Sequence, residues 1–425
     1  MSDKVYKGFK VQLKPNNWQR NRIVQYAGAA RFAYNWALQK EMEAFENHGD
    51  FISDGDLRKE FTKLKKEKDY KWLQEIYNEV TKQAIKDCVD AFRKYFEKRK
   101  KPNYVRYTKK QIEHAQRVNK TLTEYDSQGH PKFKCKWKSE DNGFYLDPVA
   151  LQLTESSVRI PVLYSGKGHK AKRVERKSSV RLKEKKRIPV GTKYVNPRIT
   201  YDGENWWLSL SAEIDADDLP DRPMSEGIGI DLGVNYTSVL SNGDYYENIN
   251  KSSKVRKLEK KKKRLQKQRS KKYRMNNKEG EYKKTKNIIK LDKKILRVDH
   301  RISGIREDFR HQMTSQIIKL EPGFIAIEDL NVRGMMKNKH LSKAIQTQGF
   351  REIRRQLEYK GKRSNIPVIP VDRWFASSKT CSCCGYKKND LKLSDRVFKC
   401  PNCGVEMDRD YNSSLCIKTY AEQVI

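Results

Sequence analysis

Two pairs of closely spaced cysteines place the tightest constraint on the fold of this chain. Cys381 and Cys384 are separated by two residues, as are Cys400 and Cys403, and fifteen residues lie between the pairs. A glycine follows the second cysteine of each pair, so each pair can form a turn that presents two thiolates at tetrahedral angles. We therefore predict a zinc ribbon at 381–405, in which one structural Zn²⁺ has four sulfur ligands and takes no part in catalysis.

The other cysteines do not suggest a disulfide framework. The chain has 425 residues and 8 cysteines, which is too few for a disulfide-stabilised fold of this length. Cys383 does not share the two-residue spacing, and Cys88 lies in a helical apolar pattern that predicts a core position. Neither a run of 18 apolar residues nor a secretory signal pattern is present. We expect a cytoplasmic protein with no membrane partner.

The positive charge of the chain is concentrated in a few segments. The formal net charge is +38, from 92 Lys and Arg residues and 54 Asp and Glu residues. Most of this excess lies in three segments: 251–300 (+17), 161–190 (+9) and 91–110 (+8). A solvated surface is the ordinary explanation of one basic run, but three internal runs favour surfaces that bind nucleic-acid phosphates. Tyr104, Tyr107 and Tyr164 beside these runs could stack on bases, although packing is the simpler role for each.

Apolar spacing in the first half predicts a helical block inserted into a β domain. Residues 4–13 alternate like a strand, and helical spacing then dominates to about residue 100. From 110 to 220 the pattern predicts short strands of a small antiparallel barrel, at 144–146, 149–153, 158–163 and 197–214. Residues 215–223 are rich in Asp and Pro and predict a linker to a second domain.

The second half predicts a different α/β domain. Three strands joined by short turns begin at residue 227, and two long basic helices then form an antiparallel hairpin. The elements expected after the hairpin are a strand at 324–330, a helix at 342–360, a strand at 366–371, the cysteine ribbon and a closing helix at 408–419.

Several carboxylates fall where metal-dependent chemistry needs them. Asp231 ends an apolar strand. Glu328 and Asp329 lie within the predicted strand at 324–330, so at least one of them is placed beside the middle of a sheet, where an unpaired charge is costly unless a cation compensates it. Asp408 has the ordinary role of a helix N-cap, so Asp410 is the better candidate to face the sheet. Three such acids suit two Mg²⁺ ions about 3.5–4 Å apart that assist phosphodiester cleavage without a histidine or serine nucleophile.

Two other interpretations remain open on these residues alone. Gly-Ile-Asp-Leu-Gly at 229–233 also begins the phosphate-binding strand of actin-like ATPases, but such an enzyme would not explain the cysteines or the charge. A non-catalytic zinc-ribbon protein that binds nucleic acid would have the cysteines and the charge, but it would not need three placed acids. Loss of cleavage with retained binding in Asp231→Ala would favour the nuclease over the non-catalytic protein, and measurable ATP turnover would favour the ATPase.

Five motifs together resemble the TnpB proteins of bacterial insertion-sequence transposons, ancestors of the type V CRISPR effectors. The motifs are Gly-Ile-Asp-Leu-Gly at 229–233, Ile-Glu-Asp-Leu-Asn at 327–331, Ser-Lys-Thr-Cys-Ser-Cys-Cys-Gly at 378–385, Cys-Pro-Asn-Cys-Gly at 400–404 and Asp-Arg-Asp-Tyr-Asn at 408–412. The resemblance implies an RNA-guided DNA endonuclease with an RNase H-like, RuvC-type nuclease domain. It implies that Asp231, Glu328 and Asp410 are catalytic and bind the two Mg²⁺ ions. The chain departs from the family at Ser413 and Ser414, where small apolar residues are more usual.

The resemblance also implies a domain organisation and a set of partners. The implied domains are a wedge-like β-barrel (1–14 and 111–220), a helical recognition domain (15–110), a RuvC-like domain (221–380 and 406–425) with a basic hairpin (251–320), and a zinc ribbon that binds target nucleic acid (381–405). The implied partners are a guide RNA and target double-stranded and single-stranded DNA, bound by a monomer in the prokaryotic cytoplasm or nucleoid. A compact type V CRISPR effector, guided from a CRISPR array, is the alternative with the same chemistry.

Overall fold

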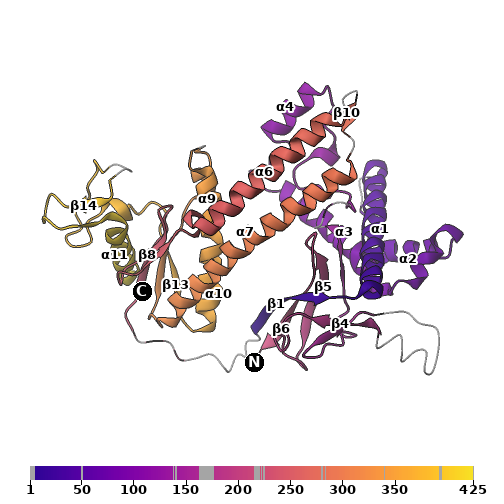
Figure 1. Cartoon of the computed structure of the whole chain (residues 1–425), viewed down its shortest axis with the longest axis horizontal. Helices are drawn as coiled ribbons and strands as arrows, with labels where there is room; N and C mark the ends of the chain where they lie inside the picture. The colour runs from indigo at the N-terminus through magenta and orange to yellow at the C-terminus, as the bar shows by residue number, and fades with distance from the viewer. Residues whose placement is uncertain are drawn as a thin grey trace. The chain divides into compact units, whose positions relative to one another are not determined.

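The chain forms two compact units, Met1–Ala216 and Asp217–Ile425, which together make an α/β protein (Figure 1). The computed structural model describes residues 5–48, 51–136, 138, 141–161, 177–214, 221, 223, 225–278, 281–282, 284–338, 340–391 and 395–424. Tyr164 and most of the predicted linker lie outside these residues. Within them, no helix is both long enough and apolar enough to cross a membrane.

A six-stranded antiparallel sheet organises the first unit, in the order β2-β5-β6-β1-β4-β3. Its strands are β1 (Val5–Lys14), β2 (Gly143–Tyr145), β3 (Ser157–Arg159), β4 (Ser179–Leu182), β5 (Tyr194–Tyr201) and β6 (Trp206–Ile214). The first strand of the chain pairs with β6 from Val5↔Ile214 to Leu13↔Trp206, so strands distant in sequence share the sheet. Among the described residues no ladder joins β2 to β3, and closure into a barrel stays a prediction.

The helices of this unit lie between β1 and β2 in the chain. They are α1 (Asn17–His48), α2 (Asp54–Leu64), η1 (Lys68–Glu75), α3 (Asn78–Arg99), α4 (Lys109–Arg117) and η2 (Glu124–Asp126). The predicted helical block before residue 100 is confirmed, and Cys88 is fully buried on α3, as its spacing predicted. Tyr104 and Tyr107 donate hydrogen bonds to backbone carbonyls, which supports the packing role for both.

Three details of the strand prediction in this unit are wrong. Residues 149–153 form no strand, and only Leu153 makes an isolated bridge. β4 lies inside the basic segment 161–190, where the exposed charged residues obscured the alternation of its buried ones. The helix α4 lies in a region predicted to be strand-like, and a capping box at Thr108 starts it.

Glu41 on α1 is a buried carboxyl within the helical core. It has no exposed surface, its Oε1 has no hydrogen-bond partner, and its Oε2 accepts a hydrogen bond from the Ile52 backbone amide at 3.2 Å. Burial raises the pKa of Glu41 to about 7. Since the folded-state pKa of Glu41 exceeds the usual value of 4.5, the contribution of this carboxyl to the stability of the unit is greatest below pH 4.5 and is lost as the pH rises through about 7.

Glu41→Gln should therefore stabilise the protein in a pH-dependent way. We expect a gain of about 1–3 kcal/mol in the free energy of unfolding at pH 8, which falls towards zero near pH 5 because wild type is then protonated. Denaturant unfolding at both pH values measures it. Glu46→Gln, an exposed position on the same helix, is the matched control. An equal effect of Glu41→Gln at pH 5 and pH 8 would contradict the assignment.

A five-stranded mixed sheet organises the second unit, in the order β13-β12-β7-β8-β9. Its strands are β7 (Ile228–Asp231), β8 (Tyr236–Leu240), β9 (Tyr245–Glu247), β12 (Ile325–Glu328) and β13 (Val368–Val371). The first three are antiparallel and confirm the predicted meander, whereas β12 and β13 run parallel to β7. Two small hairpins are β10 (Asn277–Lys278) with β11 (Glu281–Tyr282), and β14 (Val397–Lys399) with β15 (Glu406–Asp408).

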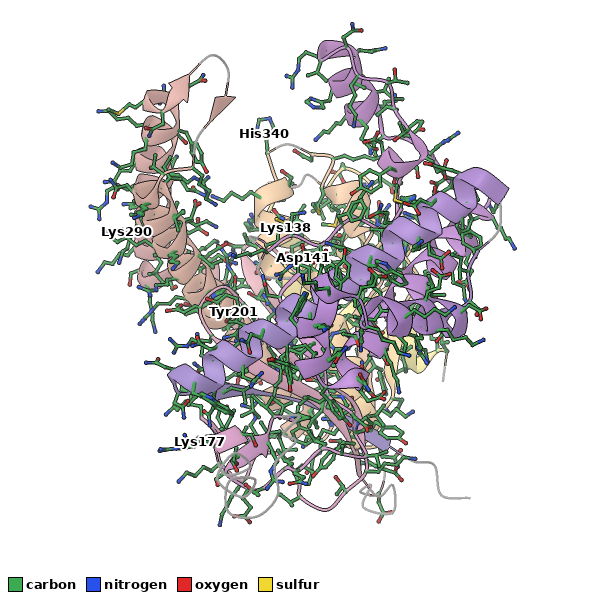
Figure 2. All side chains as sticks on the ribbon, turned by 90° about the vertical axis from the view of Figure 1, so that its right-hand side faces the viewer. Lys138, Asp141, Lys177, Tyr201, Lys290 and His340 are labelled. Atoms are coloured by element: carbon green, nitrogen blue, oxygen red, sulfur yellow. The ribbon has the colours of Figure 1, made fainter. Side chains whose placement is uncertain are left out.

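The predicted basic hairpin is confirmed as two long helices. The helices of this unit are η5 (Ile249–Lys251), α6 (Ser253–Met275), α7 (Lys286–Lys319), α8 (Val332–Met335), α9 (Ser342–Gln348), α10 (Phe350–Arg363), η6 (Ser377–Lys379) and α11 (Arg409–Glu422). α6 and α7 lie side by side (Figure 1), held by an apolar seam and by ion pairs such as Lys262 with Asp299. Figure 2 labels one exposed cation of the hairpin, Lys290 on α7. The single helix predicted at 342–360 is wrong, since the chain breaks at Gly349, whose φ is +72°.

Helices cover both faces of this sheet. Ile230 and Ile327 pack with residues of α7, α9 and α10, whereas Ala326 packs with residues of α11 on the opposite face. Successive side chains of a strand point to opposite faces. The next residues after the two isoleucines, Asp231 and Glu328, therefore fall on the face that α11 covers.

Candidate active site and metal centre

Asp231 and Glu328 come together because their strands are neighbours. β7 and β12 are parallel with Ile230 opposite Ile327, so both acids stand at the carboxyl ends of adjacent strands. That edge of a parallel sheet is the usual place for a ligand site. Burial raises the pKa of Asp231 well above its usual value, and the charges of Glu328 and Asp410 raise it further. Burial also raises the pKa of Glu328, and the charge of Asp410 adds to that shift.

The third predicted acid comes from the first turn of α11. Asp408 caps this helix, since its Oδ1 accepts hydrogen bonds from the amides of Asp410 and Tyr411 at 2.9 and 3.0 Å, as the sequence predicted. Asp410 lies in the first turn of the helix, and its Oδ1 forms an ion pair with the guanidinium of Arg409 at 2.8 Å. Its charge acts on both strand-end acids, so the three carboxylates predicted from sequence form one electrostatic group.

The structure distinguishes Glu328 from its neighbour Asp329. Asp329 faces the opposite side of the sheet, where Arg354 and Arg373 bind its carboxylate at 2.6 and 2.5 Å. Glu328 instead accepts a hydrogen bond from the Ser377 hydroxyl. The charge of Asp329 is therefore compensated by protein cations. No salt bridge to Glu328 or Asp231 occurs among the described residues, so a bound cation would compensate those charges.

Two serines that support the acids were not predicted. Ser413 on α11 donates a hydrogen bond to Asp231 Oδ1 at 3.1 Å, and Ser377 on η6 donates to Glu328. The sequence marked Ser413 only as a small residue, whereas the folded chain gives its hydroxyl a partner. No sequence motif drew attention to Ser377, because its contact depends on a loop that returns to β12.

Gly229 lets α11 approach the sheet closely enough for these contacts. A Cβ atom at this position would lie 2.1 Å from the carbonyl oxygen of Ser414 and 2.6 Å from the amide of Lys418. Both are backbone atoms of a helix, so relief would require moving α11 away from β7.

Gly229→Ala should therefore displace the helix that carries Asp410. We expect a loss of about 2–4 kcal/mol in the free energy of unfolding, because overpacking against backbone cannot relax through a rotamer change. Gly304→Ala on α7 is the matched control, since its Cβ would meet nothing within 4 Å and the change should stabilise the helix by about 0.5–1 kcal/mol. Equal stability of the two variants would contradict the close approach of α11.

The four predicted cysteines converge on one point. The Sγ atoms of Cys381 and Cys403 are 3.6 Å apart, as are those of Cys384 and Cys400, and all four lie within 4.8 Å of one another. Tetrahedral zinc with Zn–S bonds of about 2.3 Å requires sulfurs about 3.8 Å apart. Cys383 is exposed and is not one of the four. The donor set thus fits a structural Zn²⁺ ion, and its softness argues against Mg²⁺ at this position.

Asn412 fastens this cysteine cluster to α11. Its side chain is fully buried, donates to the carbonyl of Thr380 at 2.6 Å and accepts from the amide of Ser382 at 3.0 Å. Cys416, one turn further along α11, also contacts the Thr380 carbonyl, at 3.2 Å. The first cysteine turn is therefore held by the helix that carries Asp410 and Ser413.

Comparisons with known proteins find matches along almost the whole chain. Family models match residues 1–50 (helix-turn-helix domain), 209–339 (probable transposase) and 350–417 (Cas12f1-like, TNB domain). The structure of the first matched region is a strand, β1, followed by the single long helix α1. A protein of Streptomyces pristinaespiralis named "Putative RNA-guided DNA endonuclease" is 27% identical over 416 residues, which are 97% of this chain and 89% of that protein. "Putative RNA-guided DNA endonuclease InsQ" of Escherichia coli is 26% identical over 426 residues, or 97% and 91% of the two chains.

The fold also has a counterpart among solved structures. A chain of the cryo-EM structure of the Cas12f1–sgRNA–target DNA complex matches 98% of this chain over 99% of its own length, with a TM-score of 0.54 and 14% identity. The sheet with strand-end acids and the attached cysteine cluster thus define a multidomain α/β protein with a Cas12f1-like fold. The three family models and the two relatives that span almost the whole chain agree with the resemblance to the TnpB family that the sequence motifs gave.

Proposed function

We propose that this protein is an RNA-guided DNA endonuclease that cuts DNA in a RuvC-type, RNase H-like site. The observation that supports the proposal is that Asp231 and Glu328 stand at the carboxyl ends of the neighbouring strands β7 and β12, and that the charge of Asp410 on α11 raises the pKa of both. Relatives that share almost the whole length of the chain are named as RNA-guided DNA endonucleases.

The acidic group fits divalent cations. Its donors are carboxylate oxygens, which Mg²⁺ prefers, and Asp231 and Glu328 have no ion-pair partner among the described residues, which favours a cation over an empty site. Two bound Mg²⁺ ions would activate water and stabilise the leaving 3′ oxygen. The chain itself holds Asp231 through Ser413 and Glu328 through Ser377, which fixes the orientation of the carboxylates. The guanidinium of Arg409 offsets part of the charge on Asp410.

The remaining parts of the chain suit the nucleic-acid partners. We assign the sheet of the first unit (1–14 and 111–220) to a wedge domain, its helices (15–110) to recognition, and 381–405 to target binding. The basic hairpin within 251–320, with exposed Lys290, would contact the phosphates of guide RNA or of the RNA–DNA duplex. In guided systems base pairing reads the sequence, while the protein holds the backbone. We expect a monomer to carry one guide.

The proposal is tested by purifying the protein with its bound nucleic acid. We expect one discrete small RNA whose guide segment programmes Mg²⁺-dependent cleavage of a matching duplex. RNA encoded beside a transposon end supports the transposon guide, and RNA from a CRISPR array supports the effector alternative. RNA binding without cleavage of any matched target in Mg²⁺ or Mn²⁺ would contradict the proposal and favour a non-catalytic binding protein.

A further inference from the structure

One arginine reaches the acidic group formed by Asp231, Glu328 and Asp410. The Nε and Nη2 atoms of Arg409 donate hydrogen bonds to Asp410 Oδ1 at 3.1 and 2.8 Å. Both side chains of this pair are only 14% exposed, so water and salt screen it less than they screen a surface ion pair. Arg409 thus places a largely buried positive charge on a carboxylate of the proposed metal site.

The same charge acts on a second acid. Burial raises the pKa of Asp231, and the charges of Glu328 and Asp410 raise it further. The Ser413 hydrogen bond and the charge of Arg409 act in the opposite direction. Among the groups that shift this pKa, Arg409 is the one cation. Its guanidinium therefore offsets part of the mutual repulsion of the carboxylates.

The helix itself does not account for Arg409. This residue is the first of α11, where a cation opposes the helix dipole, whose positive end is at the N-terminus. Asp408 supplies the N-cap of the helix. The Arg409 amide donates to the Arg396 carbonyl at 2.8 Å, a backbone contact that any residue except proline can make. The position in the helix therefore gives no reason for a positive charge, whereas the acids do.

The contact occupies an oxygen that a metal ion would use. Both hydrogen bonds from Arg409 end on Asp410 Oδ1, and no described residue donates to Oδ2. A divalent cation can bind Oδ2 beside the guanidinium, or it can displace the guanidinium from Oδ1. In both cases the ion approaches a positive charge that the chain holds in place, and repulsion between like charges is strong in a partly buried site.

We propose that Arg409 is a built-in counter-ion that competes with divalent cations for the acidic group and so sets the concentration of Mg²⁺ that the group requires. Before the metal binds, the guanidinium holds the Asp410 carboxylate and offsets part of the negative charge. When the metal binds, the guanidinium and the ion share one carboxylate, so the arginine lowers the affinity. The inference deepens the proposed function and rests on it, because it concerns the regulation of that same site.

Binding of Mn²⁺ measures this competition without requiring cleavage. The full-length zinc-loaded protein is freed of nucleic acid and titrated with Mn²⁺, and the unbound ion is counted by its electron paramagnetic resonance signal. We expect Arg409→Gln to bind Mn²⁺ about 5- to 50-fold more tightly than wild type, the scale of removing one unit charge close to the ion. The Asp231→Ala protein gives the background of ions bound elsewhere, which is subtracted.

Two variants separate charge from structure in this titration. Arg409→Lys keeps the charge and should stay within about threefold of the wild-type affinity. Lys418→Gln removes a positive charge from the same helix, at a side chain that pairs with Glu226 at 2.8 Å, and should leave Mn²⁺ binding unchanged. Equal or weaker binding by Arg409→Gln would overturn the proposal, because an arginine that only supports the structure cannot lower the affinity of the site.

Thermal unfolding gives a second measurement, which holds even if Arg409→Gln is less stable than wild type. A ligand stabilises the folded protein more as its affinity rises, so addition of Mn²⁺ should raise the unfolding midpoint of Arg409→Gln more than that of wild type. Equal rises in the two proteins would count against the competition.

Cleavage supplies a third comparison, since Arg409→Gln should reach half of its own maximal rate at a lower Mg²⁺ concentration than wild type. An unchanged Mg²⁺ requirement together with unchanged Mn²⁺ binding would overturn the inference while leaving the proposed function intact. A wild type that does not cleave would instead contradict the proposed function, and the Mn²⁺ titration would still decide this inference.

Discussion

The Asp410→Asn variant is expected to lose at least about 10³-fold in cleavage rate, the scale of losing a residue on which the chemical step depends. Asp410 acts electrostatically on both Asp231 and Glu328, so its carboxylate belongs to the group that would hold the cations. Asparagine has the same shape but only one neutral oxygen donor, which weakens the hold on Mg²⁺. Guide RNA binding should be unchanged, because the substitution leaves the basic surfaces intact.

Asp408→Asn is the matched control for this prediction. Asp408 caps α11 through its side-chain oxygen, and asparagine is an equally good N-cap residue, so we expect cleavage within about threefold of wild type. Single-turnover cleavage of a matched duplex in Mg²⁺ compares the two variants. Loss of cleavage in Asp408→Asn with retention in Asp410→Asn would reverse the assignment of the third acid, and retention in both would remove α11 from the site.

Cys400→Ser is expected to abolish zinc binding and cleavage together. A structural zinc site contributes about 10–16 kcal/mol to the folding of its module, so loss of one thiolate should unfold the ribbon. The effect would reach the acids, because Asn412 joins the first cysteine turn to α11 and Ser377, just before that turn, holds Glu328. Zinc content by metal analysis should fall from about one ion per chain to none.

Cys383→Ser is the control for the zinc prediction. Cys383 has the same chemistry and lies between two ligands in sequence, but it is exposed and outside the group of four sulfurs. We expect its zinc content and cleavage to match those of wild type. Full cleavage by Cys400→Ser without zinc would show that the ribbon does not position the acids. Loss of zinc in Cys383→Ser would show that the set of four zinc ligands is wrong.

Most elements of the second unit could be predicted because local sequence specifies them. Glycine-bounded apolar runs gave β7 and β12, and the three- and four-residue spacing from Leu291 to Phe309 gave α7. Errors arose where a local signal was masked. Charge obscured the alternation in β4, and the positive φ of Gly349 divided a continuous helical pattern into α9 and α10.

The candidate acids illustrate the limit of a local pattern. Their residue types, the strand-end position of Asp231 and the N-cap role of Asp408 are readable from sequence. The strand-end position of Glu328 was not, since the predicted strand continued to residue 330 and β12 ends at Glu328. The choice between Glu328 and Asp329 could not be made from the local pattern, because it depends on which face of the sheet is covered by α10, which carries Arg354. The family resemblance selected Glu328, and the structure supplies a physical reason for that choice.

The sequence by itself determined the spacing of the four cysteines, the helical hairpin, the candidate acids apart from the choice between Glu328 and Asp329, and the excess of positive charge, since each depends on residue type or on short-range spacing. Only the tertiary structure decided which residues support them. Ser377, Ser413 and Asn412 acquire their partners through contacts between segments distant in sequence. A hydrogen bond between distant segments leaves no periodic trace in the sequence, because the fold and not the neighbouring residues brings its two atoms together.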